Sequence, residues 1–353
     1  MNKVFSKIVA SHYVLPTKRL TNEDLCLRFD PKKIKGISKL SGIKQRCIAS
    51  IGVTSVDLGA EAARRMIESG QIDRDSVDML IFATQTPDNI LPASAFILHD
   101  RLGLSQHCGA FDISMGCTAF PYSLSVANGL IASGQCAKIL LVVADTISKL
   151  IHPEDRSLVP LHGDGAAAFM IEKSDGNDGI EFTEIGTESS GWRHLIVPDG
   201  GMRNPLTPKS YEKKIDESGI CTSNANLQMN GAAVFHFSIS TVPEAIKQTF
   251  EKRGLSSSDY SLILLHQANK MMLDTIYNAI GATQEQRFFF MENIGNLSAA
   301  STPVLLAEAA RQDKFKNGGK VLLASFGVGL TWGLISMSIK PCGIKAADAS
   351  TVF

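Results

Sequence analysis

The sequence predicts an α/β fold in which one unit occurs twice. Short apolar runs of β-type composition alternate along the chain with segments of helical periodicity. Continuous apolar strands are typical of sheets that helices cover on both faces. Four such runs carry the prediction: VDMLIFATQ (77–85), AKILLVVAD (137–145), LILLHQ (262–267) and GKVLLASFG (319–327).

Two pairs of these runs are separated by the same offset, which indicates an internal repeat. SVDMLIFATQ begins at Ser76, and SDYSLILLHQ begins 182 positions later at Ser258. AKILLVVA begins at Ala137, and GKVLLASF begins at Gly319, which is again 182 positions later. The identity within each pair is weak, but the shared offset favours duplication of an α/β unit.

Helices are expected between the apolar runs. Segment 54–70 has Thr54 and Asp57 at the spacing of a capping pair, and Gly70 marks its end. Segment 241–254 has a proline in its first turn and a glycine at its end, which predicts a second helix over those residues.

Composition narrows the class of protein. The 353 residues include 35 basic and 35 acidic side chains, and 44% of the chain is hydrophobic. A net charge of zero argues against a nucleic-acid partner, since phosphates require a basic face. The apolar run 139–144 is far shorter than the ~20 residues that span a bilayer, and residues 1–20 lack the signal-peptide plan. Seven cysteines without a CxxC motif or zinc spacing predict reduced thiols in the cytoplasm.

One cysteine stands at the start of a predicted helix. Cys117 begins CTAFPYSLSVANGLIASG (117–134), and the offset of 182 relates it to Ala299 in GNLSAAST (295–302). A thiol in the first turn faces unpaired N–H groups and the positive end of the helix dipole, which predicts a lowered pKa. The alternative is a structural role, because a free cysteine also packs as a small hydrophobe.

Two further residues favour a site. His266 directly follows the strand LILL, at the edge where α/β folds bind ligands. Asn296 lies in the turn that corresponds to the turn carrying Cys117. Taken singly, His266 is a strand-end histidine and Asn296 a turn residue or helix cap. Duplication would bring all three side chains to one cavity.

Several segments resemble the β-ketoacyl-acyl-carrier-protein synthase III family of the thiolase superfamily. They are DISMGCTAF (112–120), HGDGAAAF (162–169), LLHQANKMM (264–272), ENIGNLSAASTP (292–303) and ASFGVGLTWG (324–333), and the resemblance runs from about residue 3 to 340. It implies a thiolase-like, duplicated five-layer αβαβα fold and a homodimer. The expected halves are 1–180, with the nucleophilic cysteine, and 181–340, with the histidine and asparagine; 341–353 is expected to be a peripheral tail.

The resemblance also implies a mechanism. Cys117 takes an acyl group from a thioester, and the backbone amides of Cys117 and Val328 bind the oxyanion. His266 and Asn296 then donate hydrogen bonds to the carbonyl of a malonyl-type thioester as it loses carbon dioxide. The carbanion attacks the acyl-cysteine, in fatty-acid initiation or in a specialised lipid or polyketide pathway. Implied partners are acyl and malonyl thioesters of coenzyme A or acyl carrier protein, without a metal or redox cofactor.

The chain departs from the family where coenzyme A is expected. The tryptophan and arginine that stack on adenine fall on Gly36 and Leu40, and a second arginine falls on Met271, beside Lys270. Arg156 matches the one remaining nucleotide-contacting arginine. Loss of a stacking ring and a charged fork predicts weak coenzyme A binding and an acyl donor on a carrier protein, or coenzyme A bound differently. Arg46 and Lys44 are candidate contacts for an acidic carrier.

Two further segments carry specificity predictions. NILPAS (89–94) matches a loop that closes the partner's acyl pocket in the family, and Leu91 replaces its usual phenylalanine, which predicts a primer longer than acetyl. An apolar interface residue is the alternative. Segment 191–228 is long, and we expect it to cover part of the substrate entrance, with Trp192 as a candidate contact.

Other functions stay open at this point. An acyl-cysteine enzyme can pass its acyl group to an oxygen or nitrogen nucleophile without decarboxylation. A chain of this family can also be the inactive subunit of a ketosynthase heterodimer. The latter alternative predicts loss of the nucleophile, whereas Cys117, His266 and Asn296 are all present.

Overall fold

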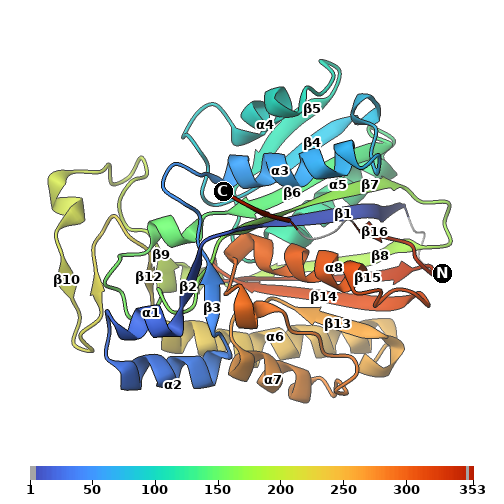
Figure 1. The fold of residues 1–353 in the computed structure, drawn as a ribbon. Helices are drawn as coiled ribbons and strands as arrows, with labels where there is room; N and C mark the ends of the chain where they lie inside the picture. Colours follow the sequence, from blue (N-terminus) through green and yellow to red (C-terminus); the bar gives the residue numbers. More distant parts are fainter. Residues whose placement is uncertain (1–4, 347–349) are drawn as a thin grey trace.

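The computed structural model, which describes residues 5–346 and 350–353, has two sheets between three layers of helices (Figure 1). One apolar cluster packs two helices on the outer face of the first sheet, and another packs two helices on the second sheet. A third cluster fills the space between the sheets. Helices α3 (Ser55–Glu68) and α4 (Ser94–Leu102) cover the outer face of the first sheet. Helices α5 (Ala119–Ala132) and α8 (Ser301–Arg311) lie between the sheets. Helices α6 (Gly231–Arg253) and α7 (Lys270–Ala279) cover the outer face of the second sheet.

The first sheet has the order β16–β1–β7–β6–β4–β5, and β17 also pairs with β1. The second sheet has the order β13–β14–β15–β8. The strands of the first sheet are β1 (Ser6–Pro16), β4 (Met79–Ala83), β5 (Gly109–Ile113), β6 (Lys138–Asp145), β7 (Gly165–Lys173), β16 (Lys345–Ala346) and β17 (Ser350–Val352). Those of the second are β8 (Gly179–Thr187), β13 (Leu262–Leu265), β14 (Gly319–Gly327) and β15 (Thr331–Ile339).

The two sheets repeat one topology, which confirms the predicted duplicated α/β fold. The order β1–β7–β6–β4 in the first sheet corresponds to β8–β15–β14–β13 in the second. The isolated parallel bridge between Ile263 and Arg287 occupies the position of β5. Helix α8 begins at Ser301, 182 residues after α5 begins at Ala119, so the offset in the sequence is the offset of the fold. The connection between the sheets is 174–178, because β8 already begins at Gly179.

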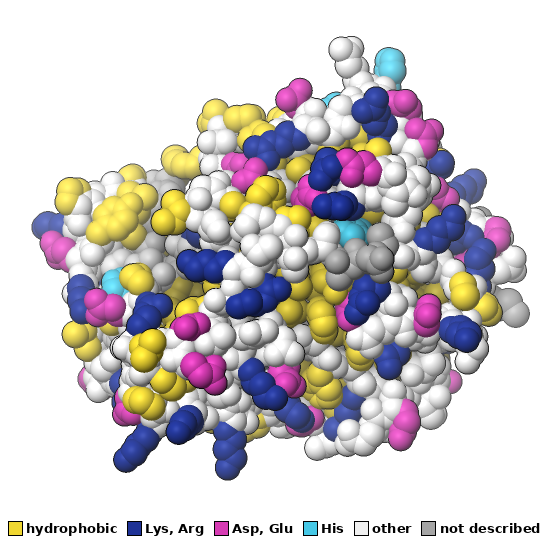
Figure 2. Space-filling view, viewed as in Figure 1, with side chains coloured by type: hydrophobic (Ala, Val, Ile, Leu, Met, Phe, Trp, Pro, Cys, Tyr) yellow, Lys and Arg dark blue, Asp and Glu magenta, His cyan; other side chains and the backbone are white. Residues whose placement is uncertain are grey.

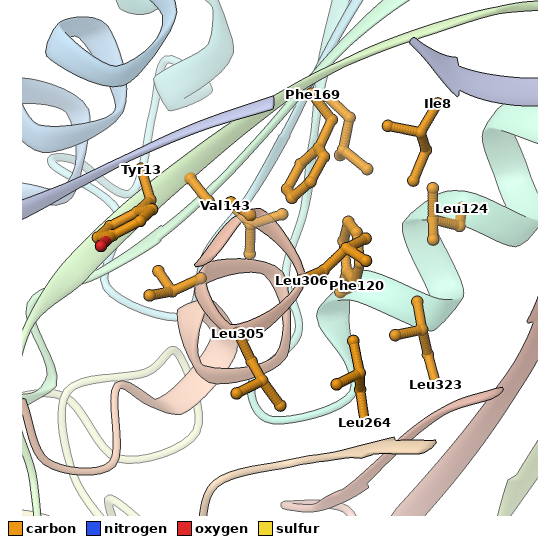
Figure 3. Packing of buried hydrophobic residues seen from close by; sticks show 14 of the residues in the cluster. Ile8, Tyr13, Phe120, Leu124, Val143, Phe169, Leu264, Leu305, Leu306 and Leu323 are labelled. Atoms are coloured by element: carbon orange, nitrogen blue, oxygen red, sulfur yellow. The ribbon is translucent and has the colours of Figure 1, made fainter. Parts of the chain in front are cut away.

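The core between the sheets is built from both halves (Figure 3). The rings of Phe120 on α5 and Phe169 on β7 lie 4.8 Å apart between their centroids. Burial of this apolar surface is the main favourable term in folding, at roughly 25 cal/mol per Å². Because α5 and α8 both sit in this core, their N-terminal ends are held in fixed positions. The other side chains labelled in Figure 3 are Ile8, Tyr13, Leu124, Val143, Leu264, Leu305, Leu306 and Leu323.

Two helix predictions differ in outcome. The capping box of Thr54 and Asp57 on α3 is present as predicted. The helix expected from 241 begins ten residues earlier, at Gly231, so Pro243 lies inside α6 and not in its first turn. The Asn230 side chain accepts the N–H of Ala233 at 3.0 Å and starts the helix there. Packing of the α6 face against the second sheet outweighs the local signal of the proline.

The C-terminal segment, expected to be a peripheral tail, pairs with the edge of the first sheet. β16 and β17 both pair in parallel with β1, at Ala10–Ser11 and at Val14–Pro16. They therefore extend the edge of the first sheet. Residues 347–349, between them, lie outside the described residues.

Smaller elements lie outside the two sheets and the helices that cover them. Segment 191–228 projects from the body beside α1 and α2 (Figure 1). No helix among the described residues 5–346 and 350–353 is long and apolar enough to cross a membrane. The small elements are β2 (Arg19–Thr21), α1 (Asn22–Cys26), α2 (Pro31–Ser41), β3 (Gln45–Cys47), β9 (Leu195–Ile196), β10 (Lys214–Ile215), β11 (Cys221–Thr222) and β12 (Gln228–Met229).

Candidate active site

Cys117 lies in the turn between β5 and α5, and its side chain is buried. Two glycines allow the backbone to approach it. A Cβ on Gly327, where φ is 153°, would lie 2.5 Å from Cys117 Sγ, and a Cβ on Gly116 would lie 2.2 Å from Gln85 Oε1. Side chains at either position would displace the thiol or its neighbours.

Three polar groups act on the thiol. The backbone N–H groups of Val328 and Cys117 and the hydroxyl of Ser298 each lower its pKa. The Thr331 hydroxyl donates to the carbonyl of Val328 at 2.8 Å and lies 2.7 Å from the hydroxyl of Thr118, which anchors the 327–329 turn to the start of α5. These contacts fix the backbone of Val328 in the wall of a pocket that Cys117 also lines.

The pKa predicted for this thiol is wrong in direction. Burial raises the pKa of Cys117 to about 11, and the charge of Asp145 adds to the rise. The hydrogen bonds from Val328, Cys117 and Ser298 lower the pKa but do not offset the loss of solvent. Helix α5 begins two residues later, at Ala119, so Cys117 precedes the first turn and desolvation is the largest influence on its pKa.

This environment gives a testable pH dependence. Below its pKa, the thiolate fraction of a cysteine rises about tenfold per pH unit. We therefore expect the rate of Cys117 alkylation by iodoacetamide to rise about tenfold per pH unit from pH 7 to pH 10. Peptide-level mass spectrometry separates Cys117 from the other six cysteines. A rate that is already constant between pH 7 and pH 9 would show that the thiol has a low pKa.

His266 follows β13 and continues its pairing, with its N–H bonded to the carbonyl of Ala324 at 2.8 Å. Its ring meets Phe326 edge to face, with 5.7 Å between the ring centroids. Burial, together with the neighbouring His162, lowers the pKa of His266 to about 3. The imidazole is therefore neutral at physiological pH, and protonation does not interfere above pH 5.

The Asn296 side chain has a defined orientation. Its Oδ1 accepts the N–H of Ser298 at 3.0 Å and the hydroxyl of Ser301 at 2.9 Å. Both partners are donors, so this atom is the oxygen and Nδ2 remains free to donate. The backbone of Asn296 pairs with the 161–163 segment, where its N–H donates to the carbonyl of Leu161 at 2.8 Å.

The structure brings Cys117, His266 and Asn296 to one pocket. We call it the helix pocket, because α6 and α7 form much of its wall; it is lined by these three residues and by Leu161, His162, Leu195, Met229, Gly231, Val234, Phe235, Ser238, Ala268, Asn269, Met272, Phe326 and Gly327. A second pocket, the loop pocket, also reaches the thiol; it is lined by Gln85, Cys117, Ile147, Leu150, His162, Leu195, Ile196, Val197, Leu227, Ser298 and Val328. The thiol thus lies where the two pockets meet.

Comparison with known proteins decides the family. The model described as "3-Oxoacyl-[acyl-carrier-protein (ACP)] synthase III" matches residues 111–191, and the model of its C-terminal part matches residues 250–339. The β-ketoacyl-acyl-carrier-protein synthase III of Caldanaerobacter subterraneus subsp. tengcongensis is 33% identical over 330 residues, which cover 94% of this chain and 96% of that protein. The chain belongs to the β-ketoacyl-acyl-carrier-protein synthase III family.

Solved structures agree in fold. A 3-oxoacyl-(acyl-carrier protein) synthase from Burkholderia xenovorans LB400 is similar with a TM-score of 0.90 and 31% identity, over 99% of this chain and 98% of that chain. The priming β-ketosynthase of the R1128 polyketide biosynthetic pathway is similar with a TM-score of 0.83 and 26% identity, over 96% and 98% of the two chains. The predicted thiolase-like architecture of the synthase III family is therefore confirmed.

Four residues expected at the substrate lie outside both pockets. Arg156 donates to the carbonyl of Ser218, and Lys270 pairs with Asp274 at 2.6 Å. Trp192 is half-exposed, with the guanidinium of its neighbour Arg193 4.1 Å from the ring centroid. Leu91 is exposed in the loop before α4. In this single chain their predicted contacts with substrate, carrier or partner subunit stay predictions.

One candidate carrier contact is wrong. Arg46 is fully buried, because its guanidinium bonds to the carbonyls of Leu20 and Pro160 and to the side chain of Asn22 at 2.8 Å. Arg46 therefore joins β3 to these three residues by hydrogen bonds and does not reach the surface. Lys44 is exposed as expected and pairs with Glu292 at 2.6 Å.

Segment 191–228 forms part of the pocket walls. Leu195 lines both pockets, and Val197 and Leu227 line the loop pocket. The N–H of Leu227 donates to the carbonyl of Leu150 at 2.7 Å, which joins this segment to the turn after β6. That the segment covers part of the substrate entrance stays a prediction.

The sequence reasoning missed several groups around the thiol. Asp145, at the end of β6, accepts the N–H groups of Gln85 at 2.9 Å and Ala299 at 3.0 Å, and so ties the two halves together. Ser298 accepts a bond of 2.6 Å from the Gln85 amide, and its hydroxyl lowers the pKa of Cys117. An acidic residue at the carboxyl end of a parallel strand was the available signal for Asp145. His162 was visible as the first letter of HGDGAAAF.

Proposed function

We propose that this chain catalyses a decarboxylative Claisen condensation between an acyl thioester and a malonyl-type thioester. The observation that carries the proposal is the position of three residues from two halves: Cys117, His266 and Asn296 all line the helix pocket. The product, a β-ketoacyl thioester, serves fatty-acid initiation or a specialised lipid or polyketide pathway.

In the first half-reaction, the Cys117 thiolate attacks the carbonyl carbon of the acyl thioester. The backbone N–H groups of Cys117 and Val328, both of which act on the thiol, would bind the oxyanion. Collapse of the tetrahedral intermediate breaks the bond to the departing thiol and leaves an acyl-cysteine. The proton lost by Cys117 is balanced by protonation of the departing thiolate.

In the second half-reaction, the carbonyl oxygen of the malonyl thioester accepts hydrogen bonds from His266 and Asn296. The Nδ1 of His266 is buried, so the neutral imidazole would donate through Nε2. The free Nδ2 of Asn296 would be the second donor. These bonds stabilise the enolate that remains when carbon dioxide leaves. Its carbon attacks the acyl-cysteine, and the tetrahedral intermediate expels the Cys117 thiolate.

Intact-mass spectrometry tests the proposal directly. The protein is exposed to a panel of acyl thioesters of coenzyme A, carrier protein and N-acetylcysteamine, and the adduct is mapped to Cys117. Addition of a malonyl thioester is expected to remove the adduct and to release carbon dioxide and a β-ketoacyl thioester in equal amounts. Removal by alcohols or amines without malonyl would establish simple acyl transfer, and a chain that never acylates would be an inactive subunit.

The surface of α2 supports a carrier protein as the acyl donor. Gly36 and Leu40 are both exposed there, so no ring or guanidinium is offered to an adenine at these positions. The same helix carries exposed lysines that make no ion pair within the described part of the chain, and Figure 2 shows Lys and Arg side chains along the lower-left edge, where α2 lies in Figure 1. They are Lys32, Lys33, Lys35 and Lys39. An acidic carrier would be attracted to this face.

Charge reversal on α2 tests the carrier surface. We expect Lys35→Glu with Lys39→Glu to lower kcat/KM for acyl transfer from an acidic carrier by about tenfold at low salt, and less at high salt because ions screen the attraction. Acylation by an N-acetylcysteamine thioester should change less than twofold. Lys316→Glu, on the turn after α8, is the matched control. Equal loss with both donors would contradict a docking role.

A homodimer is supported by the exposed edge of the first sheet. β5 is the last strand of that sheet, and each of its residues is only half-buried. Nearby, Ile90, Leu91 and Phe96 are exposed apolar side chains. Pairing of two β5 strands would cover this edge and these side chains. Analytical ultracentrifugation that shows only monomers at micromolar concentration would contradict the dimer.

A further inference from the structure

A second imidazole borders the proposed site and has no part in the mechanism above. His162 lines both the helix pocket and the loop pocket, and it is only 9% exposed. Its backbone forms a parallel β-bridge with Asn296, in which the N–H of Gly163 donates to the carbonyl of Asn296 at 2.9 Å. The bridge fixes His162 beside the carboxamide of the site, where the two pockets meet the thiol.

The hydrogen bonds of His162 define its tautomer. Its Nδ1 lies 3.1 Å from the carbonyl of Leu158, and a carbonyl can only accept, so Nδ1 carries the hydrogen. Burial lowers the pKa of His162, which keeps the ring neutral. The other nitrogen, Nε2, is therefore a hydrogen-bond acceptor, and it bonds to no group within the described residues.

The residues that line the two pockets indicate which kind of hydrogen-bond donor suits Nε2 of His162. No aspartate or glutamate lines either pocket, so an ammonium group would lack a counter-charge there. In the loop pocket Gln85 and Ser298 are bonded to each other, and much of the remaining wall is aliphatic, as at Ile147 and Leu150. A purely aliphatic chain in this pocket would leave the acceptor of His162 desolvated and unpaired. A neutral hydroxyl on the chain would satisfy it.

We propose that Nε2 of His162 accepts a hydrogen bond from a hydroxyl group of the acyl chain, so that the preferred primer is a hydroxyacyl thioester. His162 is then a specificity-determining residue of the acyl site. A site built to bind a hydroxyl discriminates strongly against the analogue that lacks it, because the buried polar group is left unpaired. This inference rests on the proposed acylation of Cys117.

Acylation rates of matched probes test the inference. The probes are N-acetylcysteamine thioesters of butyrate, 2-hydroxybutyrate and both enantiomers of 3-hydroxybutyrate, and the readout is the rate of adduct formation on Cys117 by intact mass. We expect at least one hydroxylated probe to react tenfold or more faster than butyrate. His162→Leu should bring that ratio close to one while butyrate still reacts. His162→Gln, which retains an acceptor, should keep part of the ratio, and His107→Leu on an exposed loop should keep all of it.

Each other outcome overturns the inference. Wild-type protein that forms the butyryl adduct at least as fast as every hydroxylated adduct would reject it and leave the proposed condensation standing. A preference that survives both His162→Leu and His162→Gln would assign the selectivity to other residues. If His162→Leu slows all four probes equally, His162 either bonds to the amide of the thioester arm that the probes share or supports the fold. If no acyl donor of any kind forms an adduct, the proposed function fails and the inference fails with it.

Discussion

Cys117→Ala is expected to abolish formation of the acyl-enzyme and to lower the condensation rate by at least about 10³-fold. Cys117 lines both pockets together with His162, and an alanine methyl group cannot form the thioester bond. The measurement is intact mass after exposure to an acyl donor, followed by detection of the β-ketoacyl product.

Cys136→Ala is the matched control, because Cys136 is also a buried thiol and lies in the apolar cluster between the sheets, near the far end of α5. It should retain both the adduct and the condensation. An acyl adduct that persists in Cys117→Ala would place the nucleophile elsewhere and remove the basis of the proposed first half-reaction.

Asn296→Asp and His266→Ala are expected to separate the two half-reactions. Each removes one donor to the enolate oxygen, and loss of one such donor typically costs 10²–10³-fold in rate. Asn296→Asp retains the acceptor of Ser298 and Ser301 but replaces the donor Nδ2 with a charged oxygen. Condensation should fall by about that factor, whereas acylation of Cys117 should fall by less than about tenfold.

The readout that separates catalysis from structure is the accumulated acyl-enzyme. In both variants the adduct should form and then persist after addition of the malonyl thioester. The double variant should lose less than the product of the two single losses, because both donors act on one oxygen atom. A comparable fall in acylation and condensation would contradict the division of roles, and His107→Ala controls for loss of a histidine as such.

The fold could be predicted from the sequence because its signals are local and repeated. The run 319–327 coincides with β14, and 137–145 begins one residue before β6. Capping residues also act locally, as at Thr54 on α3. The start of α6 was missed, since the apolar contacts that stabilise its first turns come from the second sheet and outweigh the signal of Pro243.

The site was predicted in composition but not in electrostatics. Local reasoning placed Cys117 near a helix start and predicted a low pKa, whereas burial by segments from both halves raises it to about 11. Arg46 was expected on the surface because arginine usually is solvated, and its burial depends on the carbonyl of Pro160, 114 positions away. Burial by residues that are distant in the chain cannot be predicted from local patterns in a single sequence. The same holds for His162, whose position depends on a backbone bridge to Asn296.

Three side chains from two halves of the chain are proposed to act on one thioester. A crystal structure of Cys117→Ala with a bound malonyl thioester would show this arrangement. We expect the thioester carbonyl oxygen to lie within about 3.2 Å of both His266 Nε2 and Asn296 Nδ2, with its reactive carbon toward residue 117. A carbonyl oxygen bound away from both nitrogens, in a complex with an otherwise unchanged pocket, would contradict it.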